Sequence, residues 1–464
     1  MGMGRTGELS LQIGVPDGPD HPTLGGSRQN LLSIVNVTCR RGRLFGEIWV
    51  ERMDRKLIGD AIHRAIKGGA VQAPPVPGTR PDDDINFVRA QTDVGIEPTV
   101  FENYVAALKC DPDMALFDST FATVPTGGGI STGLQSISKL LLARAIGSGD
   151  VSGTVERFCS YIEKNSTSVL AVMAVSGVKA ATEVSLGPDI KLVPMKSLTP
   201  SIQRGAALGQ DQFSRLTLRD EISCALVTTL EFKPIFYRPS EGGVPSAQAQ
   251  QRVMAAFHHL DEARTLYSLL GISPAFRMFW VQPKDLLMTA GVMSGWNFNP
   301  QAFRGQDVEV DAKAAEDLAT AYFRIGHQSR NKMLRIPLDR LDKAAHGYDF
   351  TDRSIDLGIA LEALLLHDLD GQDRGELRFR LSLRGAWLGA KDEKERAVIQ
   401  AALKKMYDLR SRAVHSGMVD QSPPNRETIS QGAALCKQLI RKIIDADCRI
   451  DWNALVLGGA SDEA

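Results

Sequence analysis

The sequence predicts an α+β multidomain protein, in which a mixed α/β N-terminal region is followed by an all-helical bundle. Two observations favour this fold class. The 464 residues correspond to roughly two or three domains at about 150 residues each. Strand-like and helix-like patterns alternate up to residue 308, whereas helical patterns follow one another from about Val310 onward.

The composition is typical of a soluble globular protein. Hydrophobic residues make up 43% and charged residues 23% of the chain. Lys and Arg total 54 against 55 Asp and Glu, so any contact with RNA must come from a local basic patch. The chain contains no run of 18 apolar residues, and we expect no membrane partner.

The six cysteines give no sign of a metal or redox motif. No two of them lie at CxxC spacing, and no secretory signal precedes them. We therefore expect reduced thiols in a cytoplasmic protein that needs no metal and no cofactor.

Residues 1–84 are predicted to form an N-terminal segment. Its Gly- and Pro-rich first 28 residues predict a partly disordered start, and 73–84 predict a loop. Between them, Leu31–Thr38 and Leu44–Val50 have the composition of strands, and Asp54–Ile66 has apolar residues at helical spacing.

Residues 85–308 are predicted to form the mixed α/β region, for which a sensing or targeting role is one hypothesis. Val151–Asn165 and Gln250–Leu270 have helical patterns. Thr167–Val175 is apolar enough for a buried strand, and Ile222–Phe236 is rich in β-branched and aromatic residues.

Residues 309–450 are predicted to form the helical bundle, and 451–464 a flexible tail. Asp352 is a candidate N-cap, and Gly417 is suited to a left-handed C-cap. Pro423 and Pro424 predict that the last helix starts after them. The expected helices cover 311–328, 337–347, 352–367, 376–389, 393–416 and 426–446.

Two charged residues occupy positions where apolar residues are expected. Arg410 shares a helical face with Ile399, Leu403, Met406 and Ala413. Glu362 similarly shares a face with the apolar residues 355, 359 and 366. Because an unpaired buried charge costs several kcal/mol, we predict that Glu362 and Arg410 lie close together as a compensating pair.

His415 lies five residues after Arg410, so the two side chains point about 140° apart on an ideal helix. It stands in the last turn before Gly417. The negative end of the helix dipole is expected to favour its protonated form, which suits proton transfer.

The C-terminal part resembles a known family. The residues that carry the resemblance are IPLDRLDKAAHGYDFTDRSIDLGIALEALLL at 336–366, ELRFRLSLRGAWL at 376–388 and KKMYDLRSRAVHSG at 404–417. Together they resemble the Apea-like HEPN domain. The resemblance implies a helical bundle of four or five helices, frequent homodimerisation and, in active members, metal-independent cleavage of RNA. It also implies a role in bacterial antiviral defence or as a toxin-like effector.

The resemblance also implies the site residues. The catalytic Arg and His of the family correspond to Arg410 and His415. From the residues themselves we expect Glu362 to support the site by orienting Arg410, rather than by donating a proton. Ser411 stands where active members often carry Asn or Asp. Three further arginines are candidate RNA contacts, with solvated helix faces as the alternative: Arg380, Arg384 and Arg412.

A second function remains open from the sequence. The bundle could be a non-catalytic HEPN module that binds nucleic acid or a partner protein, or that dimerises. Arg410 and His415 would then form a buried ion pair and a helix cap, because ion-pair networks also occur for structural reasons.

Overall fold

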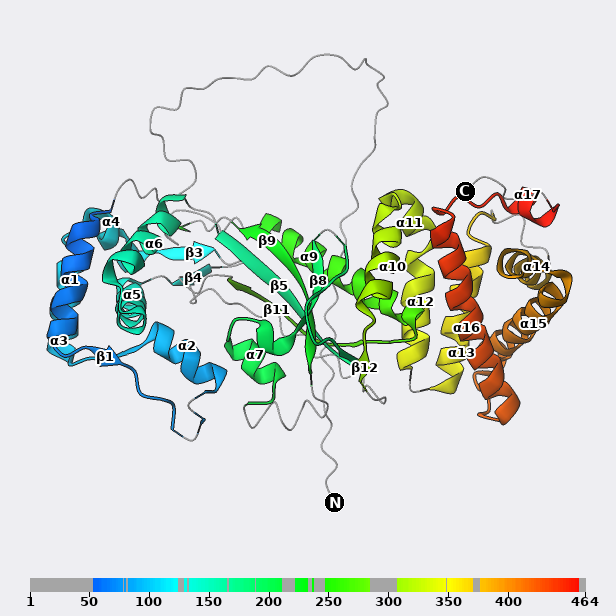
Figure 1. Cartoon of the computed structure of the whole chain (residues 1–464), viewed down its shortest axis with the longest axis horizontal. Coiled ribbons are helices and arrows are strands. Elements are labelled where there is room, and N and C mark those ends of the chain that lie inside the picture. The colour runs from blue at the N-terminus through cyan, green and yellow to red at the C-terminus, as the bar shows by residue number, and fades with distance from the viewer. Residues whose placement is uncertain are drawn as a thin grey trace, which may run out of the picture. The chain divides into compact units, whose positions relative to one another are not determined.

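The computed structural model describes residues 53–458, except 78, 81, 124–128, 132, 165–166, 188, 211–221, 233–235, 238–246, 284–306, 348 and 370–375. The described residues all belong to one unit of the chain, Phe45–Ala464. The strands predicted at Leu31–Thr38 and Leu44–Val50, and most of the predicted disordered start, lie outside the described residues. The α+β class is confirmed (Figure 1). Along the chain, one group of helices precedes the strands of the central sheet and another follows them.

The first elements form a mainly helical part. They are α1 (Arg55–Lys67), β1 (Val71–Gln72), α2 (Asp84–Thr92), β2 (Val94–Gly95), α3 (Pro98–Leu108), α4 (Pro112–Ala115), η1 (Leu116–Ser119), β3 (Phe121–Thr123), β4 (Gly129–Ser131), α5 (Leu134–Ser148) and α6 (Val151–Lys164). Helices α1 and α6 confirm the predictions made for those segments. Asp54 caps α1 by accepting from the Leu57 N–H at 3.0 Å. Ile58 and Ile62 of α1 share one apolar core with α3, α5 and α6. This core contains residues from both sides of the segment boundary predicted at residue 84.

The central feature is a five-stranded antiparallel sheet with the order β11-β5-β9-β8-β7. Its strands are β5 (Thr167–Ser176), β7 (Val184–Ser185), β8 (Ile190–Pro194), β9 (Cys224–Phe232) and β11 (Ala275–Pro283). Two of these confirm the strands predicted at Thr167–Val175 and within Ile222–Phe236. Three further short strands complete the strand inventory of this part: β6 (Val178–Lys179), β10 (Phe236–Tyr237) and β12 (Val308–Glu309).

Both faces of the sheet are covered, which explains why β5 is almost continuously apolar. Met173 of β5 points into a core shared with α9 (Ala247–Leu266), and its neighbour Val172 points into a second core on the other face. Val172 pairs in register with Trp280 of β11 and with Val227 of β9. The remaining elements around the sheet are η2 (Met195–Ser197), α7 (Ile202–Ala207) and η4 (Tyr267–Leu270).

The C-terminal region is helical and packs around an apolar core that also includes Leu266 of α9 and Leu269 of η4. Figure 1 draws its later helices in yellow to red. They are α10 (Ala312–Arg324), α11 (His327–Met333), α12 (Arg335–His346), α13 (Phe350–Leu365), α14 (Leu377–Gly389), α15 (Glu393–Ser416), α16 (Pro423–Asp445) and α17 (Trp452–Val456). No helix of the described part is long and apolar enough to cross a membrane.

Several predicted boundaries in this region were wrong. The segment 311–328 divides into α10 and α11, because the chain leaves the helical conformation at Ile325. The N-cap of α13 is Asp349, which accepts from the Thr351 N–H at 2.7 Å, and not Asp352, which lies in the first turn. Helix α16 starts at Pro423 rather than after the two prolines, since proline is well suited to the first helical turn.

The predicted flexible tail contains a short helix. Asp451 caps α17 by accepting from the Asn453 and Ala454 N–H groups, and Trp452 is buried. The buried indole holds this segment on the helical region. The prediction therefore erred for Trp452–Val456.

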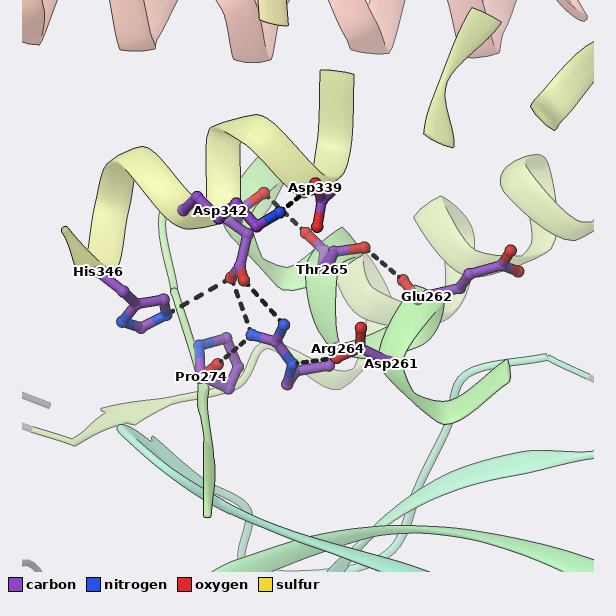
Figure 2. A network of polar contacts seen from close by, with 10 residues as sticks. Asp261, Glu262, Arg264, Thr265, Pro274, Asp339, Asp342 and His346 are labelled. Atoms are coloured by element: carbon purple, nitrogen blue, oxygen red, sulfur yellow. Dashed lines mark hydrogen bonds and ion pairs between the residues drawn. The ribbon is translucent and has the colours of Figure 1, made fainter. Parts of the chain in front are cut away.

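A buried ion pair joins the sheet-covering helix α9 to α12 (Figure 2). Arg264 donates to both carboxylate oxygens of Asp342, at 2.9 and 2.8 Å, and both side chains are almost fully buried. The same guanidinium donates to the Pro274 carbonyl at 2.9 Å and to Asp261 at 2.7 Å. Nε2 of His346 lies 3.5 Å from Asp342 Oδ1. One arginine thus fixes α9, the turn before β11 and α12 to one another.

The charge of Arg264 determines the protonation of Asp342. Burial by itself would raise the pKa of this carboxyl, but the neighbouring guanidinium outweighs burial and holds the pKa below its usual value of 3.8. A carboxyl whose pKa is lower in the folded state adds stability at higher pH. That stability is present above about pH 4 and is lost as the pH falls through the lowered value.

We predict that Asp342→Asn lowers the free energy of unfolding by about 2–4 kcal/mol at pH 7, because it takes the bidentate carboxylate from the buried Arg264 and leaves it only the ion pair with Asp261. Urea unfolding measures this loss. The matched control is Asp339→Asn on the same helix, where the pair with Lys343 is half-exposed and contributes at most about 1 kcal/mol. The difference between wild type and Asp342→Asn should shrink below about pH 4. Equal losses for both substitutions would contradict the structural role of the buried pair.

Candidate functional site

Helix α15 carries both candidate catalytic residues, and both of its ends are well defined. Asp392 accepts from the Glu395 N–H at 2.8 Å at the N-terminus. Gly417 ends the helix with φ +67°, which confirms the predicted left-handed C-cap. The predicted apolar stripe is buried, including Leu403 and Met406. Arg410 lies at the edge of this stripe.

Three glycines on three neighbouring helices allow α15 to pack closely. A Cβ on Gly358 of α13 would lie 2.3 Å from Arg410 Cγ and 2.7 Å from Arg410 Cβ. A Cβ on Gly385 of α14 would lie 2.3 Å from Leu403 Cδ1. A Cβ on Gly432 of α16 would lie 2.9 Å from Met406 Sδ. Real Cβ atoms do not approach other atoms this closely, so a larger residue would force a neighbour to move. At Gly385 and Gly432 the neighbours are the ends of flexible side chains, whereas at Gly358 they are Cβ and Cγ of Arg410, next to the α15 backbone.

Arg410 and Glu362 face each other across α13 and α15, as predicted. Arg410 Nη2 donates to Glu362 Oε2 at 3.2 Å. The two side chains retain 26% and 24% of their exposure, so the pair is open to solvent on one side. Nε of Arg410 is buried and has no hydrogen-bond partner among the described residues.

The environment of Glu362 works against its negative charge. Burial raises the pKa of this carboxyl above its usual value of 4.5, and the Arg410 charge lowers it only in part. The Arg410–Glu362 pair is therefore a compromise between desolvation and attraction.

His415 lies at the solvent-exposed end of α15. In the part of the chain that the structure describes, its ring makes no hydrogen bond and no ion pair, so it is free to contact another molecule. Ser416 defines the end of the helix by donating to the Arg412 carbonyl at 2.7 Å. The large apolar side chains of Val414 and Met418 are exposed beside His415.

The other predicted site residues differ in their surroundings. Ser411 and Arg380 are half-exposed, and Arg412 is exposed and donates to Asn425 Oδ1 at 3.3 Å. These three side chains remain within reach of solvent.

Arg384 is placed differently from the prediction. It is buried, donates to both oxygens of Asp368 at 2.6 and 3.1 Å and to the Leu365 carbonyl at 2.8 Å, and lies over the Trp452 ring. The prediction of Arg384 as an RNA contact is therefore corrected, because its guanidinium holds α13, α14 and α17 together.

Comparison with known proteins adds no assignment: no protein-family model, curated protein or solved structure matches the chain. Among the described residues, no three His, Cys, Asp or Glu side chains form a group that could hold a metal ion.

Sequence reasoning missed the part that Gly358 plays in positioning Arg410. The signal was a glycine inside an otherwise apolar helical stretch, IDLGIALEALL, where glycine weakens a helix by about 1 kcal/mol relative to alanine. A glycine kept in such a position indicates close packing against a neighbour.

We predict that Gly358→Ala destabilises the protein by about 1–3 kcal/mol, because the new Cβ meets atoms near the α15 backbone and the helix itself must move. Gly59→Ala on α1 is the matched control. A Cβ there has nothing within 4 Å, so the gain in helix propensity should stabilise the protein by up to about 1 kcal/mol. Chemical unfolding of both variants checks the sign. Stabilisation by both substitutions would contradict the close contact at Arg410.

Proposed function

We propose that this protein is a HEPN-type, metal-independent endoribonuclease in which Arg410 and His415 handle the scissile phosphate. The observation that carries the proposal is that α15 combines a half-exposed arginine with an exposed histidine at its end, which has no polar partner among the described residues. Both groups can be reached from solvent, as cleavage of a polynucleotide requires. The resemblance of residues 336–417 to the Apea-like HEPN domain supports the same activity.

The chemistry uses the nucleophile that RNA carries. The 2′-oxygen attacks the adjacent phosphorus, and its proton passes to an imidazole. The bond from phosphorus to the 5′-oxygen breaks, and that oxygen takes a proton from a second imidazole. The guanidinium of Arg410 stabilises the charge on the phosphoryl oxygens during this step. The products are a 2′,3′-cyclic phosphate and a 5′-hydroxyl.

This mechanism requires a homodimer, because one chain supplies one histidine of the motif. A two-fold axis beside the end of α15 would bring two copies of His415 and Arg410 into one cleft. The exposed Val414 and Met418, and the half-exposed Ile355 and Ile359 of α13, offer apolar area for such a contact. A cytoplasmic effector in bacterial antiviral defence, or a toxin-like protein, is the setting that the family resemblance favours.

The alternative function is a non-catalytic HEPN module that binds nucleic acid or a partner protein. The ion pair between Arg410 and Glu362 favours this alternative, since it gives the arginine a structural partner within the chain. Cleavage assays separate the two functions.

We predict that the purified protein cleaves RNA in the presence of EDTA and leaves 2′,3′-cyclic phosphate ends. His415→Ala and Arg410→Ala should each lower the rate at least about 100-fold, the usual contribution of an acid–base group or of an oxyanion-stabilising group. His63→Ala on α1 is the matched control, because His63 is also an exposed helical histidine. Its rate should equal that of the wild type.

Toxicity in cells provides the second readout, with RNA integrity measured alongside growth. Expression of the wild type should degrade RNA and slow growth, and His415→Ala should relieve both effects. Intact tRNA, mRNA and phage RNA after incubation in EDTA, with His415→Ala no less toxic than the wild type, would refute the ribonuclease.

A further inference from the structure

The side chain of Arg410 has little freedom at its base. Gly358 leaves just enough room for the Cβ and Cγ atoms of Arg410, so the stem of the arginine is confined between α13 and α15. The guanidinium consequently emerges beside Glu362, one helical turn further along α13. Close packing against α13 thus positions the stem of Arg410 without any contribution from Glu362.

The contact with Glu362 is loose for an arginine–carboxylate pair. Bidentate geometry at about 2.7–2.9 Å is typical of strong pairs. Arg264–Asp342 and Arg378–Asp408 have this geometry, each with two donors on two oxygens at 2.7–2.9 Å. Arg410 instead makes a single hydrogen bond of 3.2 Å, and its Nε has no partner among the described residues. The guanidinium therefore retains unused donor capacity.

The carboxylate is also poorly stabilised in this position. Burial raises the pKa of Glu362, and in the described structure its carboxylate accepts only the one hydrogen bond from Arg410. The free energy of such a carboxylate falls when it moves from the ion pair into water, provided that another anion binds the arginine in its place. An arginine fixed by packing and paired loosely with a carboxylate is suited to such an exchange.

We propose that Glu362 occupies the edge of the Arg410 guanidinium to which a phosphodiester of RNA binds, so that the carboxylate competes with the polynucleotide and sets the affinity of the site. This inference rests on the proposed ribonuclease function. A phosphodiester carries one negative charge and two free oxygens, and it can engage the arginine fork in the bidentate manner that Glu362 does not use. Because it must be displaced, Glu362 makes the site select ligands that carry the full negative charge of a phosphate over ligands with less charge.

The test measures RNA binding without cleavage. The probe is a fluorescein-labelled single-stranded RNA with 2′-O-methyl groups throughout, which removes the nucleophile, and fluorescence anisotropy at constant salt gives the Kd. Glu362→Gln and Glu362→Ala should each lower the Kd about threefold to fivefold, the size of effect that half-exposed charge pairs have. Adding Glu362→Gln to Arg410→Ala should leave the Kd of Arg410→Ala unchanged.

The matched control is Asp408→Asn, which removes one negative charge from α15 and releases Arg378 from its pair. It should change the Kd less than either Glu362 variant does. If the wild type binds the probe and both Glu362 variants bind it equally or more weakly, the competition is overturned and the proposed ribonuclease function is unaffected. Weaker binding would mean that Glu362 orients Arg410. A wild type that neither binds the probe nor cleaves natural RNA would overturn both proposals.

Discussion

The close approach of α13 to α15 at Gly358 is the constraint on which the candidate site depends. Because glycine has no Cβ, the stem of Arg410 can lie directly against the α13 backbone. The guanidinium then reaches Glu362 at a half-exposed position, where it is shielded enough to be fixed and open enough to meet a ligand. Gly385 and Gly432 complete the same close packing on the other sides of α15.

Two kinds of arginine–carboxylate pair in this chain have different consequences. Arg264–Asp342 is buried and bidentate, and it joins α9 to α12. Its removal mainly affects stability, because the buried Arg264 would lose its bidentate carboxylate and keep only the ion pair with Asp261. Arg410–Glu362 is half-exposed and makes one long hydrogen bond. Its contribution to stability is smaller, and its relevance lies in what else can bind the arginine.

Periodicity was enough to predict some parts of this arrangement. Arg410 and Glu362 each interrupt an apolar helical pattern, and the cost of unpaired charge leads to their pairing. Gly417 after a long helix predicts its C-cap, and the strand Thr167–Val175 follows from a continuous apolar run. These features depend on local pattern and on one general energetic argument.

Other parts could not be predicted, because they depend on contacts between distant residues. Arg264 and Asp342 are separated by 78 positions, and neither interrupts an obvious stripe. The burial of Arg384 requires Asp368 and the ring of Trp452, which lies in a segment that composition alone predicts to be a tail. Both Asp349 and Asp352 have a side chain suited to an N-cap. The helix begins after Asp349 because of where the preceding turn ends, and the sequence does not fix that point.

The pKa of Glu362, measured by carbon-13 NMR of the labelled side-chain carboxyl, tests the central claim most directly. We expect a pKa above the usual 4.5, because the close packing of α13 and α15 buries the carboxyl. In Arg410→Met the pKa should rise further, because the nearby positive charge is lost while burial is retained. A pKa at or below 4.5 that is unchanged by Arg410→Met would show that Glu362 is solvated and away from Arg410, and would contradict this account of the site.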